Sequence, residues 1–425
     1  MTARFLHGHA THPEARMALA LAAAQIEAQR HEPGHAGTPT LGWLYLTDHY
    51  AHQAEALLAD AQQRWPGVHW VGATGVGIAA GGVEYFDEPA LSLMLAELPR
   101  EHFRVFSGAR PLSNFAAHAA QVHVDPGAAD LAELVRDMSA RTDSGYLFGG
   151  LASGRTRSLH LADGVWTGGL SGVAFDAEVA LVSRVTQGCQ PVGPRRIVTA
   201  IDRNVVIALD GEPALDCLLR DVGVAGIEAR EALPKLRQIL VGLGSAHDES
   251  APAAFINDAD HSTRSAFDRT TRRDAFGADT RVRHLIGLDP SRRGIAIAEL
   301  AEVGTPLAFC TRNVDAARRD LVRICAEVRD EVEPETLPLA ALHALRDASP
   351  QDAPPTPRNG IAGAIYVSCA GRGGAHFGAP SAELALVRHA LGDVPLVGFF
   401  AGGEIARANL YGYTGVLTVF RSADE

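Results

Sequence analysis

The chain has 425 residues, which is enough for two or three domains that each bury a core. Its composition, 47% hydrophobic and 21% charged, is typical of a globular protein in water, and 38 basic against 50 acidic residues leave a net charge of −12. This acidic balance disfavours a surface for nucleic acid or for an anionic membrane. No apolar run approaches the roughly 20 residues that a membrane-spanning helix needs.

The cysteines and histidines indicate the compartment and exclude some kinds of site. The five cysteines are scattered, and none forms a Cys-x-x-Cys pair, so we expect neither a disulfide framework nor a zinc ribbon. A reducing cytoplasm is the predicted location. The amino-terminal stretch is rich in histidine, but we interpret it as irregular. Because a metal site needs ligands that a second shell holds in place, we expect no metal and no cofactor.

The first half alternates between predicted helices and strands. An amphipathic helix is predicted near residues 17–30, then a strand at 43–47, a helix at 51–64 and a strand at 69–72. Residues 90–98 predict a helix that ends before Pro99, and residues 130–139 predict another with its apolar side chains on one face. Further predicted elements are strands at 102–107, 146–150, 165–175 and 179–185, a hairpin at 197–209 and a helix at 214–220.

The second half contains two polar stretches between predicted elements. Residues 245–281 carry many charges and few large apolar side chains, and we interpret them as an inserted lid or a mobile surface loop. Residues 331–358 are rich in proline and acid and resemble a linker. The predicted elements are strands at 236–243, 282–287, 294–298 and 306–311, a helix at 314–328, strands at 363–369 and 394–400 around a helix at 382–391, and a last strand at 415–420.

Two distant segments of the chain match each other. Residues 42–48 parallel residues 363–369, and residues 71–78 parallel residues 397–405 with one extra residue in the later copy. Each pair encloses a helix-like segment, so each copy suits a parallel strand pair with a crossover helix. We interpret this as an internal duplication; the alternative is two ordinary β-α-β segments of similar composition. The predicted fold is α/β, with two related halves that each hold a mixed, largely parallel sheet flanked by helices.

Glycine-rich turns follow both strands of the later copy, and we predict a ligand site there. Backbone N–H groups and a few side chains in such turns can bind a small molecule. Arg372 could grip a carboxylate with its guanidinium fork, and Glu404 could accept an ammonium group. Arg372→Ala is then expected to weaken binding and leave the fold intact. The predicted ligand-binding residues are Ser368, Cys369, Arg372, Gly373, Gly402 and Glu404.

Each of these residues also has a structural interpretation that the sequence leaves open. Arg372 could bond to loop carbonyls, and Glu404 could cap the next element. Cys369 could be a small buried residue, or a reactive thiol whose pKa Arg372 lowers. Thr47, Asp48 and Thr74 stand at the matching strand ends of the earlier copy, where they would line the same cleft if the halves pack symmetrically.

Five motifs, in order, resemble one known family. They are WVGATGVG at 70–77, FGGLAS at 148–153, QGCQPVG at 187–193, residues 286–289 with 304–309, and SCAGRG at 368–373 with GFFAGGEI at 398–405. The chain resembles a bacterial, stand-alone FIST-domain protein, with an N-terminal FIST module at 30–212 and a C-terminal module at 213–425. The resemblance implies a sensory domain inside the cell that binds small ligands, amino acids among them, and signals through a partner protein.

Two other function classes remain beside the sensor. The first is an enzyme that uses Cys369 as nucleophile with His376 or His389 as base, and the second is an interaction scaffold with a vestigial pocket. The sequence contains no recognisable set of nucleophile, base and orienting group. We therefore predict no catalytic residues and favour a function as a ligand-binding sensor.

Overall fold

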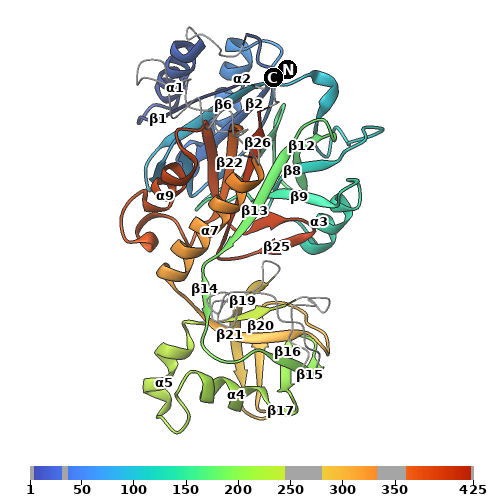
Figure 1. Cartoon of the computed structure of the whole chain (residues 1–425), viewed down its shortest axis with the longest axis vertical. Coiled ribbons are helices and arrows are strands. Elements are labelled where there is room, and N and C mark those ends of the chain that lie inside the picture. Colours follow the sequence, from blue (N-terminus) through green and yellow to red (C-terminus); the bar gives the residue numbers. More distant parts are fainter. Residues whose placement is uncertain (1–3, 31–36, 245–279, 333–359, 423–425) are drawn as a thin grey trace, which may run out of the picture. The chain divides into compact units, whose positions relative to one another are not determined.

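The computed structural model of the chain describes residues 4–30, 37–244, 280–332 and 360–422 (Figure 1). Contacts divide the chain into two compact units. Unit 1 holds residues 1–186 and 318–425, and unit 2 holds residues 187–317. This division differs from the two modules expected from the sequence, so the module boundary between residues 212 and 213 stays a prediction.

The described residues of unit 1 form three six-stranded sheets, named here A, B and C. Sheet A has the strand order β1-β6-β2-β3-β10-β11. Its strands β2 and β3 are parallel, and β6 and β10 flank this pair in antiparallel orientation. The bounds are β1 (Arg4–Thr11), β2 (Leu41–Thr47), β3 (His69–Gly75), β6 (Ala90–Glu97), β10 (His160–Ala162) and β11 (Val165–Trp166).

Sheets B and C have the same plan. Sheet B has the order β13-β26-β22-β23-β4-β5 around the parallel pair of β22 and β23, and sheet C has the order β25-β24-β9-β8-β12-β7 around the parallel pair of β8 and β9. The bounds in sheet B are β4 (Gly77–Ala80), β5 (Val83–Phe86), β13 (Leu181–Gln187), β22 (Ile361–Cys369), β23 (Leu396–Ala401) and β26 (Thr414–Arg421). Those in sheet C are β7 (Phe103–Phe106), β8 (Ala119–Val124), β9 (Tyr146–Leu151), β12 (Leu170–Phe175), β24 (Glu404–Ala406) and β25 (Asn409–Tyr411).

A helix joins the strands of each parallel pair. These helices are α2 (Ala54–Arg64) in sheet A, α3 (Leu131–Ser139) in sheet C and α9 (Ala382–Leu391) in sheet B. Leu57 of α2 packs with Leu44 of sheet A, and Met138 of α3 packs with Val122 of sheet C. Among the described residues, unit 1 also has the helix α1 (Ala15–Arg30), the part of α7 (Val314–Val332) from Arg318 onward, and the short turns η1 (Asp48–Gln53), η2 (Arg100–His102) and η3 (Gly374–Phe377).

Three copies of one strand pattern build these sheets. Repeat 1 spans residues 4–97, repeat 2 spans 103–175, and repeat 3 spans 181–421, which unit 2 interrupts in the sequence. In each repeat a hairpin follows the parallel pair and joins the sheet of another repeat. The hairpin of repeat 1 (β4–β5) pairs with β23, that of repeat 3 (β24–β25) with β9, and that of repeat 2 (β10–β11) with β3. The sheets therefore exchange hairpins in a closed cycle.

A glycine marks the same position in every repeat. Gly72 lies opposite Leu44, Gly149 opposite Val122, and Gly398 opposite Tyr366. A Cβ atom on any of these glycines would clash with the carbonyl oxygen of the residue opposite, so only glycine allows the close approach. The three pairs align the repeats residue by residue.

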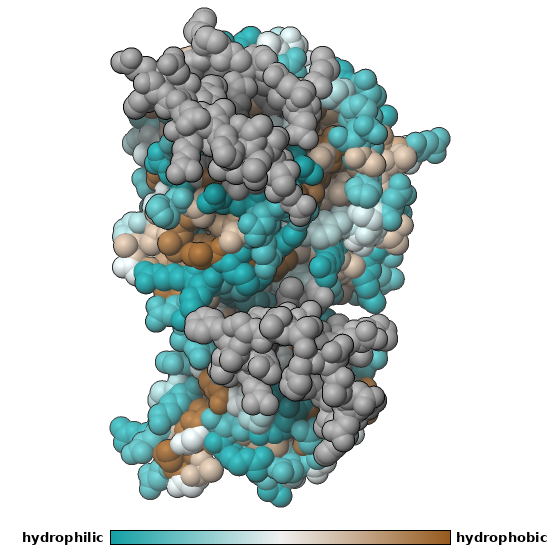
Figure 2. Space-filling view, in the orientation of Figure 1, coloured by the Kyte–Doolittle hydropathy of each residue, from teal (hydrophilic) through white to brown (hydrophobic). Residues whose placement is uncertain are grey.

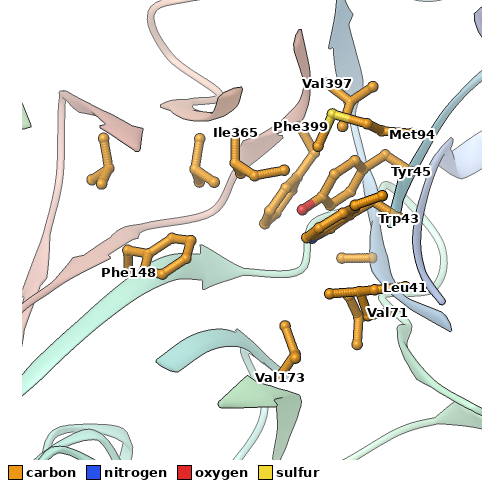
Figure 3. Packing of buried hydrophobic residues seen from close by; sticks show 14 of the residues in the cluster. Leu41, Trp43, Tyr45, Val71, Met94, Phe148, Val173, Ile365, Val397 and Phe399 are labelled. Carbon is orange, nitrogen blue, oxygen red and sulfur yellow. The ribbon is translucent and has the colours of Figure 1, made fainter. Parts of the chain in front are cut away.

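The inner faces of the three sheets share one core (Figure 3). Trp43 and Tyr45 come from sheet A, Phe399 from sheet B and Phe148 from sheet C. The rings of Tyr45 and Phe399 stack with their centroids 5.2 Å apart. Aromatic rings that bury this much apolar surface contribute strongly to the free energy of folding.

Unit 2 is a closed antiparallel barrel. Its six strands form the ring β15-β16-β20-β19-β18-β21, and β21 pairs again with β15. Closure leaves no unpaired edge in the ring. Buried apolar side chains such as Val241 and Phe309 form its core. The bounds are β14 (Cys189–Pro191), β15 (Arg196–Asp202), β16 (Val205–Leu209), β17 (Glu212–Pro213), α4 (Ala214–Asp221), α5 (Ala229–Leu236), β18 (Ile239–Leu243), β19 (Arg281–Asp289), β20 (Gly294–Ile297) and β21 (Pro306–Arg312).

The α/β class is confirmed, and both matching segments have the predicted parallel pairing. Two local predictions are wrong. In place of the helix predicted at residues 90–98, strand β6 spans Ala90–Glu97, because this segment lies between β1 and β2 and is buried on both faces. The amino-terminal stretch is strand β1 at the edge of sheet A. The polar segment 245–281 lies almost wholly outside the described residues, as does the linker at 331–358.

The sequence also missed the second of three repeats. Strand β8 escaped prediction because Gln121 and His123 place polar side chains in the core. There Gln121 accepts a hydrogen bond from Trp43 Nε1 at 2.7 Å and donates one to Tyr45 Oη at 2.7 Å. The polar pattern of this strand therefore reflects a buried network rather than a solvent-facing side.

Candidate functional site

The predicted site residues meet at the carboxyl ends of β22 and β23. The strands are parallel with Cys369 opposite Ala401, and the N–H of Ala370 donates to the carbonyl of Ala401 at 2.8 Å. The two glycine-rich turns that follow are therefore neighbours. Gly371 and Gly402 are exposed, whereas Arg372 and Glu404 are buried beneath them.

Arg372 forms a buried ion pair. Its Nε and Nη2 atoms donate to Glu383 Oε1 at 2.9 and 2.7 Å, and both side chains are at most 1% exposed. Burial opposes the charged guanidinium, but the attraction of Glu383 outweighs it, so the pKa of Arg372 is raised. Glu383 also accepts hydrogen bonds from Tyr366 Oη at 2.7 Å and from Ser368 Oγ at 3.1 Å. Arg372 would have to leave Glu383 in order to bind a ligand carboxylate.

A second carboxylate, from another repeat, completes this cluster. Glu84 lies on β5 of the exchanged hairpin and accepts hydrogen bonds from the N–H groups of Gly374 at 3.1 Å and Leu384 at 3.2 Å. It thereby satisfies a free N–H at the start of α9. Burial and the nearby charge of Glu383 raise the pKa of Glu84 to about 7.

Glu404 is the residue with unused binding capacity. It is fully buried, and its Oε2 accepts hydrogen bonds from the N–H of Thr414 at 3.0 Å and from its hydroxyl at 2.7 Å. Its Oε1 has no hydrogen-bonding partner among the described residues. Burial raises the pKa of Glu404 to about 7. A Cβ atom placed on the nearby Gly402 would meet no atom closer than 3.8 Å, so there is space at this turn.

Cys369 lies beside Glu404 as a neutral thiol. Burial and the charge of Glu404 raise the pKa of the thiol to about 12, and Arg372 lowers it only to a smaller extent. Of the two interpretations left open for Cys369, the raised pKa does not favour a thiol that Arg372 activates, because Glu383 pairs with the guanidinium. Gly373 packs closely, since a Cβ atom there would clash with the ring of Phe86.

The polar side chains at the matching strand ends of repeat 1 are held by hydrogen bonds. Thr74 Oγ1 accepts from the N–H of Leu159 at 2.9 Å, and Asp48 accepts from the N–H of Arg155 at 2.7 Å. Thr47 Oγ1 accepts from the N–H of Ala90 at 2.9 Å. All three residues thus tie neighbouring segments together and do not present a free polar group.

The sequence analysis named Arg372 and Glu404 but missed the groups that form the hydrogen bonds around these two residues. Glu383, Tyr366 and Thr414 carry no motif, and Glu84 lies almost three hundred positions before its hydrogen-bonding partners. Its role depends on the hairpin exchange, for which the sequence contains no local signal. Within the described part of the chain, no three His, Cys, Asp or Glu side chains are arranged to hold a metal ion.

No helix in the described ranges is both long and apolar enough to cross a membrane. The face shown in Figure 2 is mostly hydrophilic, and its apolar residues lie in small patches. The apolar side chains on the inner faces of the three sheets of unit 1 pack against one another, as Figure 3 shows.

Known proteins match the chain over nearly its whole length. An uncharacterized protein of Mycobacterium tuberculosis (strain CDC 1551 / Oshkosh) is 30% identical over 431 residues, which cover 97% of this chain and 98% of that protein. An uncharacterized protein of Mycobacterium bovis (strain ATCC BAA-935 / AF2122/97) is 28% identical and covers 97% of each chain.

Two family models match in tandem. The FIST N domain matches residues 40–212 and the FIST C domain matches residues 214–407. FIST domains are taken as sensory domains in signal transduction. The motifs that carried the resemblance lie within these ranges, and their order along the chain agrees with the two matches. The chain therefore belongs to the FIST family, with an N and a C domain in one polypeptide.

Proposed function

We propose that this protein is a sensory module that binds a small ligand with an ammonium group, such as an amino acid, at the ends of β22 and β23. The observation that carries the proposal is the unpartnered Oε1 of Glu404, which is fully buried beside an exposed glycine turn. A buried carboxylate oxygen without a partner is costly, and a ligand cation would satisfy it.

The ligand would bind mainly through Glu404. An ammonium group favours the ionised carboxylate, so its binding would lower the raised pKa of Glu404 and release a proton. Because the pKa of Glu404 in the ligand-free protein is about 7, the affinity for the ligand should increase as the pH rises through that value. The carboxylate of an amino acid could meet N–H groups of the glycine turns, since Arg372 is already paired with Glu383.

The signal would leave through a partner protein, in the cytoplasm of a bacterium. All five cysteines are free, in agreement with a reducing compartment. A role as enzyme has less support, because the Cys369 thiol is neutral at physiological pH and is not an activated nucleophile.

Calorimetric titration with a panel of amino acids, simple amines and small carboxylates tests the proposal. A charge-assisted hydrogen bond contributes roughly 1.5–3 kcal/mol, so Glu404→Gln should weaken binding about 10- to 100-fold. Glu55→Gln, an exposed carboxylate on α2, is the matched control and should leave affinity unchanged. A ligand that binds Glu404→Gln as tightly as the wild type would place the site elsewhere.

A further inference from the structure

A pocket of about 370 Å³ opens in unit 1, away from the Glu404 site. It lies where strands β8 and β9 begin, between these strands of sheet C and two strands of sheet B, the edge strand β13 and its neighbour β26. The Glu404 site instead lies where β22 and β23 end. The lining includes His118, Tyr146, Phe148, Leu181, Arg184 and Arg421. The volume falls within the range of roughly 300–1,000 Å³ that small-molecule sites occupy.

The repeat pattern explains why this pocket exists. The N–H of Asp176 donates to His102 O, and in the same way the N–H of Arg421 donates to Ala180 O. The next residues, Phe103 and Leu181, therefore occupy equivalent positions. Phe5 has that position in repeat 1, because Phe5 pairs with Ala96 as Phe103 pairs with Phe175. Two repeats thus place an aromatic ring where the third places a leucine.

The aromatic rings fill the two other junctions between sheets. Phe5 packs on Phe420 with ring centroids 4.9 Å apart, and Phe103 meets His69 edge-on at 6.0 Å. At the third junction, the smaller Leu181 faces the start of sheet C, where the residue is Ala119. The missing ring leaves the space between sheets B and C open.

The charged residues at this junction, formed by repeat 3, also differ from those at the equivalent junction formed by repeat 2. His102 and Asp176 form a pair at 2.7 Å that closes the junction in repeat 2. The equivalent positions in repeat 3 hold Ala180 and Arg421. Ala180 has no charged side chain, so it cannot form an ion pair with Arg421. Arg421 is exposed and forms no ion pair with a described residue, whereas Arg184 is bound by Glu327 and Glu331.

We propose that this open junction binds a small organic acid, whose carboxylate pairs with Arg421 and whose apolar body lies against Leu181 and Phe148. An arginine fork suits a carboxylate, and the apolar walls suit an aromatic or aliphatic body. Ser183 and Thr418, whose hydroxyls are 2.8 Å apart in the pocket wall, add polar contacts between these two ends. The proposal is independent of the ligand at Glu404.

Titrations followed by ligand-observed NMR test this site with 3-phenylpropionate and hexanoate, and with the neutral 3-phenylpropanamide as a matched probe. We expect the acids to bind with a Kd of about 1 mM or tighter, and the amide about 10-fold more weakly. Arg421→Gln should remove this preference for the acid. Arg104→Gln, an exposed strand arginine that does not line the pocket, should leave it unchanged.

Leu181→Phe tests the geometric argument, because it supplies the ring that repeats 1 and 2 already have. The variant should fold and lose binding of both acids by at least about 10-fold. Ala119→Leu fills the same space from the opposite wall of the pocket. This variant serves as the test if Leu181→Phe does not fold. Absence of acid binding to the wild type, or undiminished binding in the filled and Arg421→Gln variants, would overturn the proposal.

Discussion

Repeats 1 and 3 contain the same strand–helix–strand segment, but they differ at the position that Glu404 occupies in repeat 3. The register makes Ile78, His160 and Glu404 equivalent, since they pair with Phe399, Ala73 and Gly150 at corresponding positions. Ile78 packs in the apolar core, and His160 bonds to Ser171 Oγ at 2.6 Å. Glu404 keeps one oxygen without a partner among the described residues. The proposed recognition group Glu404 therefore lies where one repeat departs from the plan that the repeats share.

The largest expected effect is a difference in stability between a variant that breaks the ion pair of repeat 3 and one that breaks the ion pair of repeat 1. Arg372→Ala leaves Glu383 buried without its partner and should lower the free energy of unfolding by about 3–5 kcal/mol. The sequence-based expectation that this substitution leaves the fold intact is therefore revised. Arg155→Ala removes the half-exposed partner of Asp48 in repeat 1 and should cost at most about 1 kcal/mol. Urea unfolding of both variants measures the difference, and equal losses would contradict it.

The buried carboxyls should make stability depend on pH. The pKa values of Glu84 and Glu404 are raised from 4.5 to about 7. The folded state therefore favours their protonated forms, and this stabilisation is full below the unfolded value and is lost as the pH rises through about 7. For Glu404 the loss amounts to roughly 3 kcal/mol.

Denaturant unfolding at a series of pH values between about 5 and 8 measures this loss. Glu404→Gln should flatten the decline, because an amide keeps its size and does not titrate. Glu55→Gln again serves as the control, with the wild-type decline. A wild-type stability that rises from about pH 5 to pH 8 would contradict the burial of neutral carboxyls.

A smaller effect distinguishes two glycines of repeat 3. A Cβ atom at Gly398 clashes with the carbonyl of Tyr366, so Gly398→Ala should destabilise the protein by roughly 1–3 kcal/mol. Gly402→Ala has space around it and should change stability by less than about 0.5 kcal/mol. Thermal unfolding of the two variants tests this, and a larger loss at Gly402 would show that the turn is packed differently.

The parts of the fold that local patterns specify could be predicted from the sequence. The parallel strand pairs of repeats 1 and 3 could be predicted because their strands are apolar on both faces and end in glycine turns. Strand β8 could not be predicted, because Gln121 and His123 are buried polar residues whose hydrogen bonds go to Trp43 and Tyr45 inside the core. Strand β6 resembled a helix because every residue but its last is buried, which removes the alternation of a half-exposed strand.

The candidate site was only partly predictable for a different reason. The residues at the two glycine turns are close in sequence to recognisable strands, so their grouping followed from parallel pairing. The pairing of Arg372 with Glu383 and the capping of α9 by Glu84 depend on tertiary contacts. Glu84 arrives on a hairpin that leaves its own repeat, and no spacing within the sequence indicates its destination.

The most direct test of the account is a pH titration of the Glu404 carboxyl carbon by NMR, assigned by comparison with Glu404→Gln. We expect this group to titrate near its pKa of about 7 in the ligand-free protein. We also expect an amino acid or amine that binds to move the titration to lower pH, because the ammonium group stabilises the carboxylate. A titration near the ordinary value of 4.5, or one that the bound ligand leaves in place, would contradict the role of Glu404.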